Sequence, residues 1–487
     1  MKLDIYHTYK QFDYANYGYP IMLNVLKMWA ESAGWTVRIS VCREKDVDLD
    51  TDADVVAFSV YTQTAPMAYR LSARLREKGK VVILGGPHFR GKPNFTREEG
   101  RLHCDVLAGS ICKEQWLGLL REIEDGKIIP NLNHPALYIE DSEHKFRYPD
   151  NFYETFQHYK LYHLATVPTT LGCPFNCSFC NPFMQGKYIL RDIQTIYNEF
   201  SRTPRFRPLF IADAASGLNK RHTIELMKAV APLKRDILME STLDRLQDLE
   251  ILDALAEGGV KWLTVGLESF NSKLDKLGKG SMKENIHRLI DNAHERGMMV
   301  EGNFIIGLDS DGPEVFDNIY DFYVQSELDI VIIDLLTPYP NTMLHYDMQK
   351  EGRIIDTNWE HYDYHHVVYR PRLMSENQLI DGFNKLYRSL YSTKMVLKNL
   401  KSAVKLGGIG NQSLGVLIYN SWGMYDSRRK EKALNRNKSH VEFLLKNKIE
   451  RGEELFFRDG ENDVELVKEI AEELLVNKGS KETVYCN

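Results

Sequence analysis

Short apolar runs alternate with longer amphipathic stretches along the first 145 residues, as expected for a parallel α/β fold. Predicted strands are Leu3–Tyr6, Val37–Val41, Asp54–Tyr61, Val81–Leu84 and Asp105–Ala108, and predicted helices are Pro20–Ala33, Pro66–Lys78 and Lys113–Glu124. The run Asp54–Tyr61 is largely apolar, which suits a strand covered on both faces. We therefore predict a doubly wound, flavodoxin- or Rossmann-like domain over residues 1–145.

A polar stretch with three prolines, Lys127–Pro149, predicts a linker. The alternation then resumes, with strands predicted at Ala165–Leu171, Leu209–Asp213, Ile237–Ser241, Trp262–Leu267, Val300–Gly307 and Ile330–Leu336. Predicted helices between them include His222–Val230, Glu250–Glu257, Lys283–Arg296 and Glu314–Gln325. These six units predict a partial barrel over residues 155–375, open on one side. Residues 376–487 predict a mostly helical C-terminal domain, with helices at Glu376–Tyr391, Val441–Lys448 and Asp463–Leu475.

Three cysteines, Cys173, Cys177 and Cys180, follow the first strand of the predicted barrel in a Cys-x3-Cys-x2-Cys arrangement. Thiolates are the ligands that iron–sulfur clusters prefer, and three of them leave one iron of a four-iron cube open for chemistry. The alternatives are a zinc site and three unrelated thiols. A structural zinc site usually takes four ligands in two pairs, and the sequence has no second pair nearby. The spacing therefore favours a 4Fe-4S cluster.

This motif, with the aromatic Phe179 beside the third cysteine, resembles the signature of the radical S-adenosylmethionine (SAM) superfamily. The resemblance covers about residues 160–345 and departs from the family at Leu171, where many members have arginine. It implies a partial (β/α)6 barrel in which the amino and carboxylate groups of SAM bind the open iron. It also implies reductive cleavage of SAM to a 5′-deoxyadenosyl radical.

The same resemblance implies SAM contacts at the ends of the later barrel strands. The candidates are Asp213, Glu240, Glu268, Ser269, Phe304 and Pro338. In the family, an acid at the position of Asp213 meets the methionine ammonium, and Glu240 would reach the ribose. Arg245 could equally neutralise Glu240, and strand-end acids are often structural ion pairs.

The N-terminal domain resembles the cobalamin-binding domain that precedes the barrel in one radical SAM subgroup. The candidate cobalamin contacts follow the third, fourth and fifth strands: Ser59, Thr62, Gly85, Gly86 and Gly109. Glycines let the backbone approach a large planar ligand, and hydroxyls offer donors to its side chains. The Asp-x-His-x-x-Gly fingerprint for a lower histidine ligand is absent, and we expect His88 to be a loop residue near the corrin. The alternative is a domain that binds nothing and shapes the substrate cleft.

Together these resemblances imply a cobalamin-dependent radical SAM methyltransferase acting on an unactivated carbon of a small molecule. A reductant such as flavodoxin or ferredoxin is the expected partner. The alternatives are a radical cyclase or rearrangement enzyme that uses cobalamin without methyl transfer, and an iron–sulfur electron-transfer protein. A methylthiotransferase fits less well, because Cys42, Cys104 and Cys112 do not form a cluster set.

The composition and net charge of the chain narrow the possible partners and cellular location of the protein. A net charge of −6 over 487 residues argues against a constitutive nucleic-acid binder. The sequence has no apolar run long enough to span a membrane and no signal-peptide pattern, so we expect a cytoplasmic protein. The run from His361 to His366 invites a metal interpretation, but we expect a polar loop there.

Overall fold

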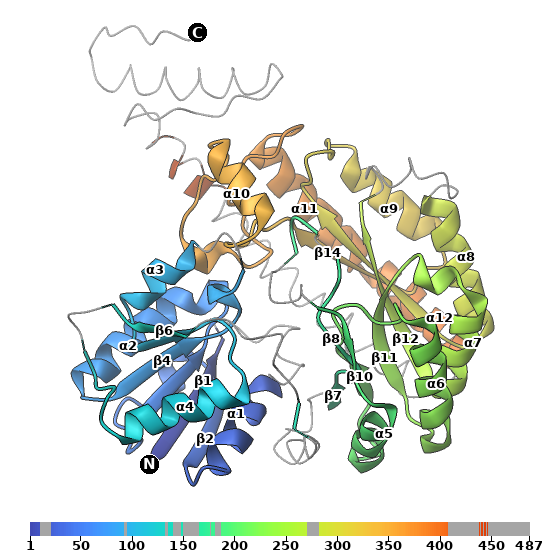
Figure 1. Cartoon of the computed structure of the whole chain (residues 1–487). Helices are drawn as coiled ribbons and strands as arrows, with labels where there is room; N and C mark the ends of the chain where they lie inside the picture. The colour runs from blue at the N-terminus through green and yellow to red at the C-terminus, as the bar shows by residue number, and fades with distance from the viewer. Residues whose placement is uncertain are drawn as a thin grey trace, which may run out of the picture.

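The computed structural model describes residues 1–9, 21–91, 95–131, 135–139, 148–149, 165–175, 177–180, 187–269 and 282–407. It also describes residues 438, 440, 441, 443, 444 and 446 near the C-terminus. Two parallel sheets, each with helices packed against it, lie side by side, the first in the blue part of the chain and the second in the green-to-yellow part (Figure 1).

The N-terminal sheet has the order β2-β1-β3-β4-β5-β6, with every pair parallel. Its strands are β1 (Lys2–Thr8), β2 (Thr36–Cys42), β3 (Val55–Ser59), β4 (Val81–Gly85), β5 (Val106–Ala108) and β6 (Leu137–Ile139). Its helices are α1 (Ile21–Glu31), α2 (Ala65–Glu77), α3 (Thr96–Arg101) and α4 (Lys113–Glu124). Successive strands are added on one side of β1 up to β2 and on the other side from β3 onward, so the strand order reverses between β1 and β3. This confirms the predicted doubly wound fold.

Strand β6 lies within the stretch predicted to be a linker, and that prediction was wrong for these three residues. A strand of three residues between polar segments is too short to show the alternation of apolar and polar positions by which a strand is predicted. Its pairing with β5 is a tertiary contact that local sequence does not encode.

The second sheet has the order β14-β13-β12-β11-β10-β7, which confirms an open six-stranded partial barrel. Its strands are β7 (Ala165–Val167), β10 (Leu209–Ile211), β11 (Ile237–Thr242), β12 (Val260–Glu268), β13 (Met299–Ile306) and β14 (Ile330–Leu335). The helices α5 (Ile193–Arg202), α6 (Lys220–Val230), α7 (Leu249–Gly258), α8 (Met282–Glu295) and α9 (Val315–Gln325) lie between them. The strand predicted over 165–171 is broken after β7, and its end forms β8 (Thr170–Leu171), which pairs antiparallel with β9 (Ile189–Leu190).

Within the described range up to residue 407, the helices that follow the barrel are α10 (Met343–Lys350), α11 (Glu376–Leu390) and α12 (Thr393–Gly407). Helix α11 agrees with the predicted helix 376–391, whereas the predicted helix 463–475 lies outside the described residues. In α12, Ala403 is buried in an apolar cluster with Trp262, Met299 and Ile330. These three residues lie in the amino-terminal parts of β12, β13 and β14, so α12 covers the base of the barrel.

Candidate active site

The three cysteines lie on the loop between β8 and β9, at the carboxyl end of the first barrel strand. The loop begins at Gly172, whose φ of 70° is a conformation that favours glycine. Within it the Cys180 amide donates to the Cys177 carbonyl at 3.2 Å, and the Leu344 amide of α10 donates to the Ser178 carbonyl at 3.0 Å. The loop is therefore held both by its own turn and by the first residues of α10.

The thiols of this loop are accessible to a cluster. Cys177 is exposed, and Cys173 and Cys180 are half-buried. Partial desolvation and the nearby Cys173 thiol raise the pKa of Cys177 above its ordinary value. Three thiols on one short loop fit a cube with one open iron, and bound iron would favour the thiolate forms. Phe179, which stands between Cys177 and Cys180 in the sequence, is partly buried and packs against the hydrophobic core.

Asp213 follows β10 and is buried beneath the start of the cysteine loop. Its Oδ1 accepts from the amides of Thr169 and Thr170 at 2.6 and 2.9 Å, and its Oδ2 accepts from the Thr169 hydroxyl. Burial raises the pKa of Asp213 despite these hydrogen bonds. The carboxylate thus fixes the two residues that lead into Gly172 and Cys173, a role that the sequence did not reveal.

Acidic side chains line the interior of the barrel on adjacent strands. Glu240 of β11, Thr264 of β12 and Glu301 of β13 lie in register across the sheet. Arg245, the alternative partner of Glu240, pairs with Asp244 at 3.2 Å. Burial raises the pKa of Glu240.

Glu301 is a site residue that the sequence analysis missed. It is 1% exposed, and its Oε1 accepts from the Thr264 hydroxyl at 3.1 Å. Burial, with Glu240 and Asp334 nearby, raises the pKa of Glu301 to about 8. The available signal was its position in the strand: side chains alternate along β13, and Glu301 lies on the same, inward face as Asn303.

Glu268 ends β12 in an unusual conformation. Its φ is 56°, and the pairing of β12 with β13 shifts register between Gly266 and Glu268. The carboxylate folds back over Gly266, where an added Cβ would lie 2.8 Å from its Oε1. Burial and the nearby Asp334 raise the pKa of Glu268 to about 7. A non-glycine residue held at positive φ marks a position that the surrounding structure over-determines.

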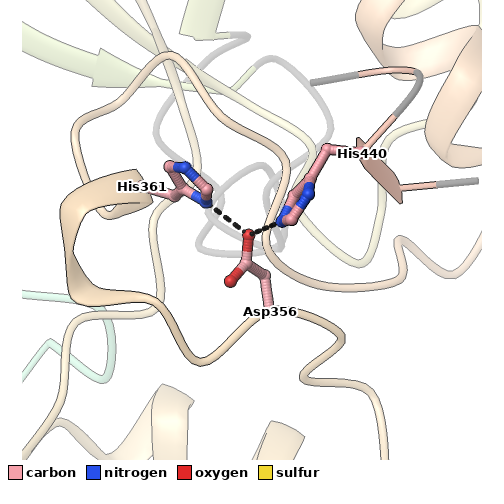
Figure 2. Close-up of side chains that lie close together, drawn as sticks. All are labelled: Asp356, His361 and His440. Atoms are coloured by element: carbon pink, nitrogen blue, oxygen red, sulfur yellow. Dashed lines mark hydrogen bonds and ion pairs between the residues drawn. The ribbon is translucent and has the colours of Figure 1, made fainter. Parts of the chain in front are cut away.

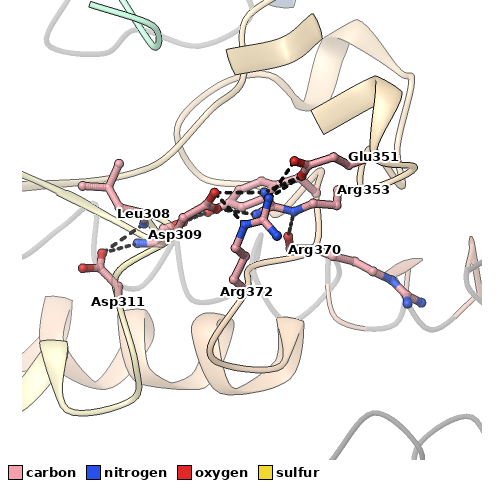
Figure 3. Close-up of polar contacts among 9 residues, drawn as sticks. Leu308, Asp309, Asp311, Glu351, Arg353, Arg370 and Arg372 are labelled. Carbon is pink, nitrogen blue, oxygen red and sulfur yellow. Dashed lines mark hydrogen bonds and ion pairs between the residues drawn. The ribbon is translucent and has the colours of Figure 1, made fainter. Parts of the chain in front are cut away.

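Ser269, next along the chain, belongs to a polar network behind the strand ends. Its hydroxyl donates to Asp311 at 3.0 Å, and Asp311 also accepts from the amides of Gly307 and Leu308. Figure 3 shows that Asp309, two residues before Asp311, meets a guanidinium group from the segment after α10. The buried Arg353 binds Asp309 at 2.6 Å and donates to the Arg370 carbonyl. The network ties the ends of β12 and β13 to the segment that follows the barrel.

Phe304 lies on the wrong face for the predicted contact with adenine. It is 1% exposed and meets Phe322 of α9 edge-to-face, with ring centroids 6.4 Å apart. This placement contradicts the expected cofactor contact, because α9 lies outside the sheet and side chains alternate along a strand. Its neighbours Asn303 and Ile305 have the inward parity. Pro338 is buried after β14, and its carbonyl accepts from His345 Nδ1 at 2.9 Å.

The candidate cobalamin residues gather at one edge of the N-terminal sheet. Ser59 ends β3, Gly85 ends β4, and Gly109 follows β5. Gly86 has a φ of 117°, and an added Cβ would lie 2.8 Å from the Val60 backbone, so only glycine fits there. The loops after β3 and β4 are joined directly, because the Val60 amide donates to the Gly85 carbonyl at 2.7 Å. A glycine-lined edge at the carboxyl ends of parallel strands suits a large planar ligand.

His88 lies in a short 3-10 helix (Pro87–Phe89) and is buried, whereas a loop residue was expected. Its Nδ1 lies 3.2 Å from the Thr62 hydroxyl and its Nε2 3.3 Å from the Tyr69 hydroxyl. Burial lowers the pKa of His88 to about 3, so the ring is neutral. Because both ring nitrogens have partners, His88 is not placed to ligate a metal.

The segments after β14 bring the two domains into contact. Asn341, with a φ of 66°, donates through Nδ2 to the His88 carbonyl and the Thr96 hydroxyl, both at 3.0 Å. Its Oδ1 accepts from the Phe95 amide at 2.6 Å. The Trp359 indole donates to Glu99 at 2.9 Å and lies edge-on to His88. The glycine-lined edge of the first sheet is thus docked beside the carboxyl ends of the barrel strands.

Comparison with known proteins agrees with this architecture. Residues 167–323 match the radical SAM superfamily model, and residues 13–110 match the B12 binding domain model. The chain is 29% identical over 365 residues to bacteriochlorophyllide d C-12(1)-methyltransferase of Chlorobaculum tepidum, covering 72% of this chain and 77% of that relative. It is 24% identical over 237 residues to the anaerobic magnesium-protoporphyrin IX monomethyl ester cyclase of Rubrivivax gelatinosus, covering 47% of this chain and 42% of that relative.

A solved structure shares the whole arrangement. The radical SAM methyltransferase TsrM from Kitasatospora setae, with cobalamin and a 4Fe-4S cluster bound, matches 88% of this chain and 99% of its own. The TM-score is 0.58 at 14% sequence identity, which establishes the likeness of fold.

The chain therefore carries a radical SAM domain over residues 167–323, preceded by a B12-binding domain over residues 13–110. It is an enzyme whose relatives include a bacteriochlorophyllide methyltransferase and a cyclase. The fold class, the superfamily and its subgroup are confirmed as predicted. None of the helices in the described part of the chain has the length and apolar character needed to cross a membrane.

Proposed function

We propose that this enzyme transfers a methyl group from cobalamin to an unactivated carbon of a small molecule, using radical SAM chemistry. The observation that carries the proposal is the docking of the B12-binding domain onto the segment after β14 through Asn341 and Trp359. The same segment also binds the cysteine loop, through the Leu344 amide and the Ser178 carbonyl. Radical formation and methyl delivery must reach the same carbon, so the two cofactor sites must face one chamber. The relationship to a methyltransferase over 72% of the chain supports the same conclusion.

The cofactors are assigned to the residues that fit them. Cys173, Cys177 and Cys180 would hold the 4Fe-4S cluster, and Ser59, Gly85, Gly86 and Gly109 would border cobalamin. When bound, the cluster and SAM supply hydrogen-atom abstraction, and cobalamin supplies the methyl group. The contacts of SAM with Phe179, Glu240, Glu268 and Pro338 remain proposals. The electrons would come from a low-potential carrier such as flavodoxin or ferredoxin.

The chain's own carboxyl groups would orient the ligands of the barrel. Glu301, with a pKa of about 8, keeps its proton at neutral pH, so it can donate a hydrogen bond into the barrel interior. Glu268, with a pKa of about 7, is balanced between its two forms and lies beside the cysteine loop. Ionised Glu268 would attract a cationic group held near the cluster.

A cyclase reaction is the second candidate, because one relative is by name an anaerobic cyclase of a magnesium protoporphyrin ester. That likeness covers 47% of this chain, against 72% for the methyltransferase. Both names refer to magnesium tetrapyrroles or their derivatives, so this class of macrocycle is the first small-molecule substrate to test.

The test is turnover of the anaerobically reconstituted full chain with SAM, cobalamin, a low-potential reductant and a magnesium tetrapyrrole. Methyl transfer predicts 5′-deoxyadenosine, S-adenosylhomocysteine and a product heavier by one CH2 unit. With methyl-labelled SAM the label must appear in the product. A product lighter by hydrogen, without label, would establish the cyclase instead. The triple variant C173A/C177A/C180A should form no 5′-deoxyadenosine, and 5′-deoxyadenosine absent from the wild type would overturn both candidates.

A further inference from the structure

Three side chains capable of binding a metal ion meet in the segment beyond the barrel, at a position that the proposed reaction does not use. Figure 2 shows the imidazoles of His361 and His440 directed at one carboxylate oxygen of Asp356. His361 Nδ1 lies 2.6 Å and His440 Nε2 lies 3.1 Å from Asp356 Oδ2. The donor atoms all lie within 4.8 Å of one another. Residues 356 and 361 belong to one loop, whereas residue 440 comes from a separate segment.

Hydrogen bonds from Asn358 and Tyr362 fix the orientation of Asp356. Asp356 is 2% exposed, and its Oδ1 accepts from the Asn358 amide at 2.8 Å. The Tyr362 hydroxyl donates to the Asp356 carbonyl at 2.8 Å. With Oδ1 engaged by the backbone, Oδ2 is directed at the two imidazoles. Carboxylates that bind metals are commonly oriented by such outer hydrogen bonds.

A neighbouring pair fixes the orientation of His361. The His366 ring stacks on the His361 ring with centroids 4.6 Å apart, and His366 Nδ1 lies 2.8 Å from Asp363. The His440 ring meets the His361 ring edge-on, at 5.0 Å. The rings are therefore positioned by contacts other than their hydrogen bonds to Asp356.

We propose that Asp356, His361 and His440 bind one divalent transition-metal ion of the zinc type, with water in a fourth position. Two imidazoles and one carboxylate are a common ligand set for such ions. Ligands about 2.0–2.1 Å from a tetrahedral ion lie about 3.3 Å apart. The two imidazole nitrogens, now 2.6 and 3.1 Å from Asp356 Oδ2, therefore need to move away from that oxygen by less than about 1 Å. Neutral imidazoles can bind the ion through the nitrogens that now face Asp356, with their protons on the other ring nitrogens.

The position of the site gives the ion a structural role. The loop that carries Asp356 and His361 also carries Trp359 and Glu360, which contact Glu99 and Arg70 of the N-terminal domain. His440 lies beside Lys438, which pairs with Asp381 of α11 at 3.0 Å. A bound ion would therefore join the C-terminal segment to the loop that contacts the B12-binding domain.

The test measures metal content and does not depend on turnover, so it stands apart from the proposed function. Full-length protein is equilibrated with Zn²⁺ and desalted, and zinc is determined together with iron. We expect about one zinc per chain in the wild type, with at least a fivefold loss in D356N and H440A at unchanged cluster iron. Co²⁺ in place of zinc should give the visible bands of a four-coordinate site in the wild type alone.

The matched control is H222A, because His222 of α6 contacts the Arg191 carbonyl far along the chain from the site. This variant should retain zinc at the wild-type level. H361Q serves if H440A fails to fold, and circular dichroism checks each variant. Extra ferrous iron that is lost in the same variants would support a divalent site as well. Zinc and cobalt that do not bind, or that are retained in D356N and H440A, would overturn the proposal and leave a hydrogen-bonded cluster only.

Discussion

At the scale of single residues, the carboxyl groups inside the barrel set how the protein responds to pH. Glu301 is buried, and its pKa of about 8 lies above the ordinary value near 4.5. Between these values the folded chain holds a proton that the unfolded chain releases. The free energy of unfolding therefore falls as pH rises through that window, and this contribution is fully present only below it.

Replacing Glu301 with glutamine removes this pH dependence. E301Q keeps an acceptor for the Thr264 hydroxyl but cannot ionise, so its stability should match the wild type near pH 5. Near pH 9 the variant should be more stable by about 1–3 kcal/mol. Thermal unfolding of both proteins across this range measures the difference. A constant difference at all pH values would show that Glu301 does not titrate in the folded state.

The sequence predicted several of these site residues but not the residues with which they form hydrogen bonds. It marked Asp213 as a strand-end acid, but not its three hydrogen bonds to Thr169 and Thr170, because these cross from one strand to another. It selected Phe304 by resemblance to a glycine-containing element, although alternation along β13 directs that ring outward. The same alternation would have selected Glu301. Residue type indicated which side chains could act in catalysis or binding, whereas odd or even position along the strand determined which side chains face the barrel interior.

At the scale of elements, α12 closes the base of the barrel, and its sequence gives little sign of this. The helix is lysine-rich and only some of its residues are buried. Among its buried residues, Ala403 is fully buried in one apolar cluster with Trp262, Met299 and Ile330. By contrast, the long barrel strands were predicted closely, because apolar residues recur along their buried faces and polar loops bound them.

A single substitution tests the closure. A403L should lower the free energy of unfolding by about 1–3 kcal/mol, because overpacking forces neighbouring side chains out of their rotamers. V404L, at the exposed next position, adds one methylene and should change it by less than about 0.5 kcal/mol. Thermal unfolding of the two variants provides the comparison. Equal midpoints would mean that α12 does not pack on the barrel as described.

At the scale of the whole molecule, the docking of the two domains depends on a few side chains beyond β14. Asn341 makes three hydrogen bonds across the interface from a left-handed backbone conformation. The sequence predicted both domains but not the contact between them. Nothing in the sequence around Asn341, which follows a Pro-x-Pro segment, indicates which residues it binds. The docking depends on hydrogen bonds between residues about 250 positions apart in the sequence.

Two variants separate the causes of this docking. N341G loses the hydrogen bonds but adopts the left-handed conformation without strain, whereas N341A loses the hydrogen bonds and is also strained in that conformation. We expect each variant to be cleaved faster than the wild type in limited proteolysis between the domains. N341A should be destabilised further than N341G by about 1 kcal/mol, the cost of a left-handed alanine. Proteolysis at the wild-type rate in both variants would assign the docking to Trp359 and Arg70 instead.

The open edge of the barrel has a mechanical consequence. The described sheet ends at β7 on one side and β14 on the other, so its wall is not a closed ring of main-chain hydrogen bonds. Because no main-chain ladder of the described sheet joins β14 to β7, these two edges can move apart without breaking interstrand hydrogen bonds. Widening the barrel at this side therefore leaves the pairing of the six strands intact.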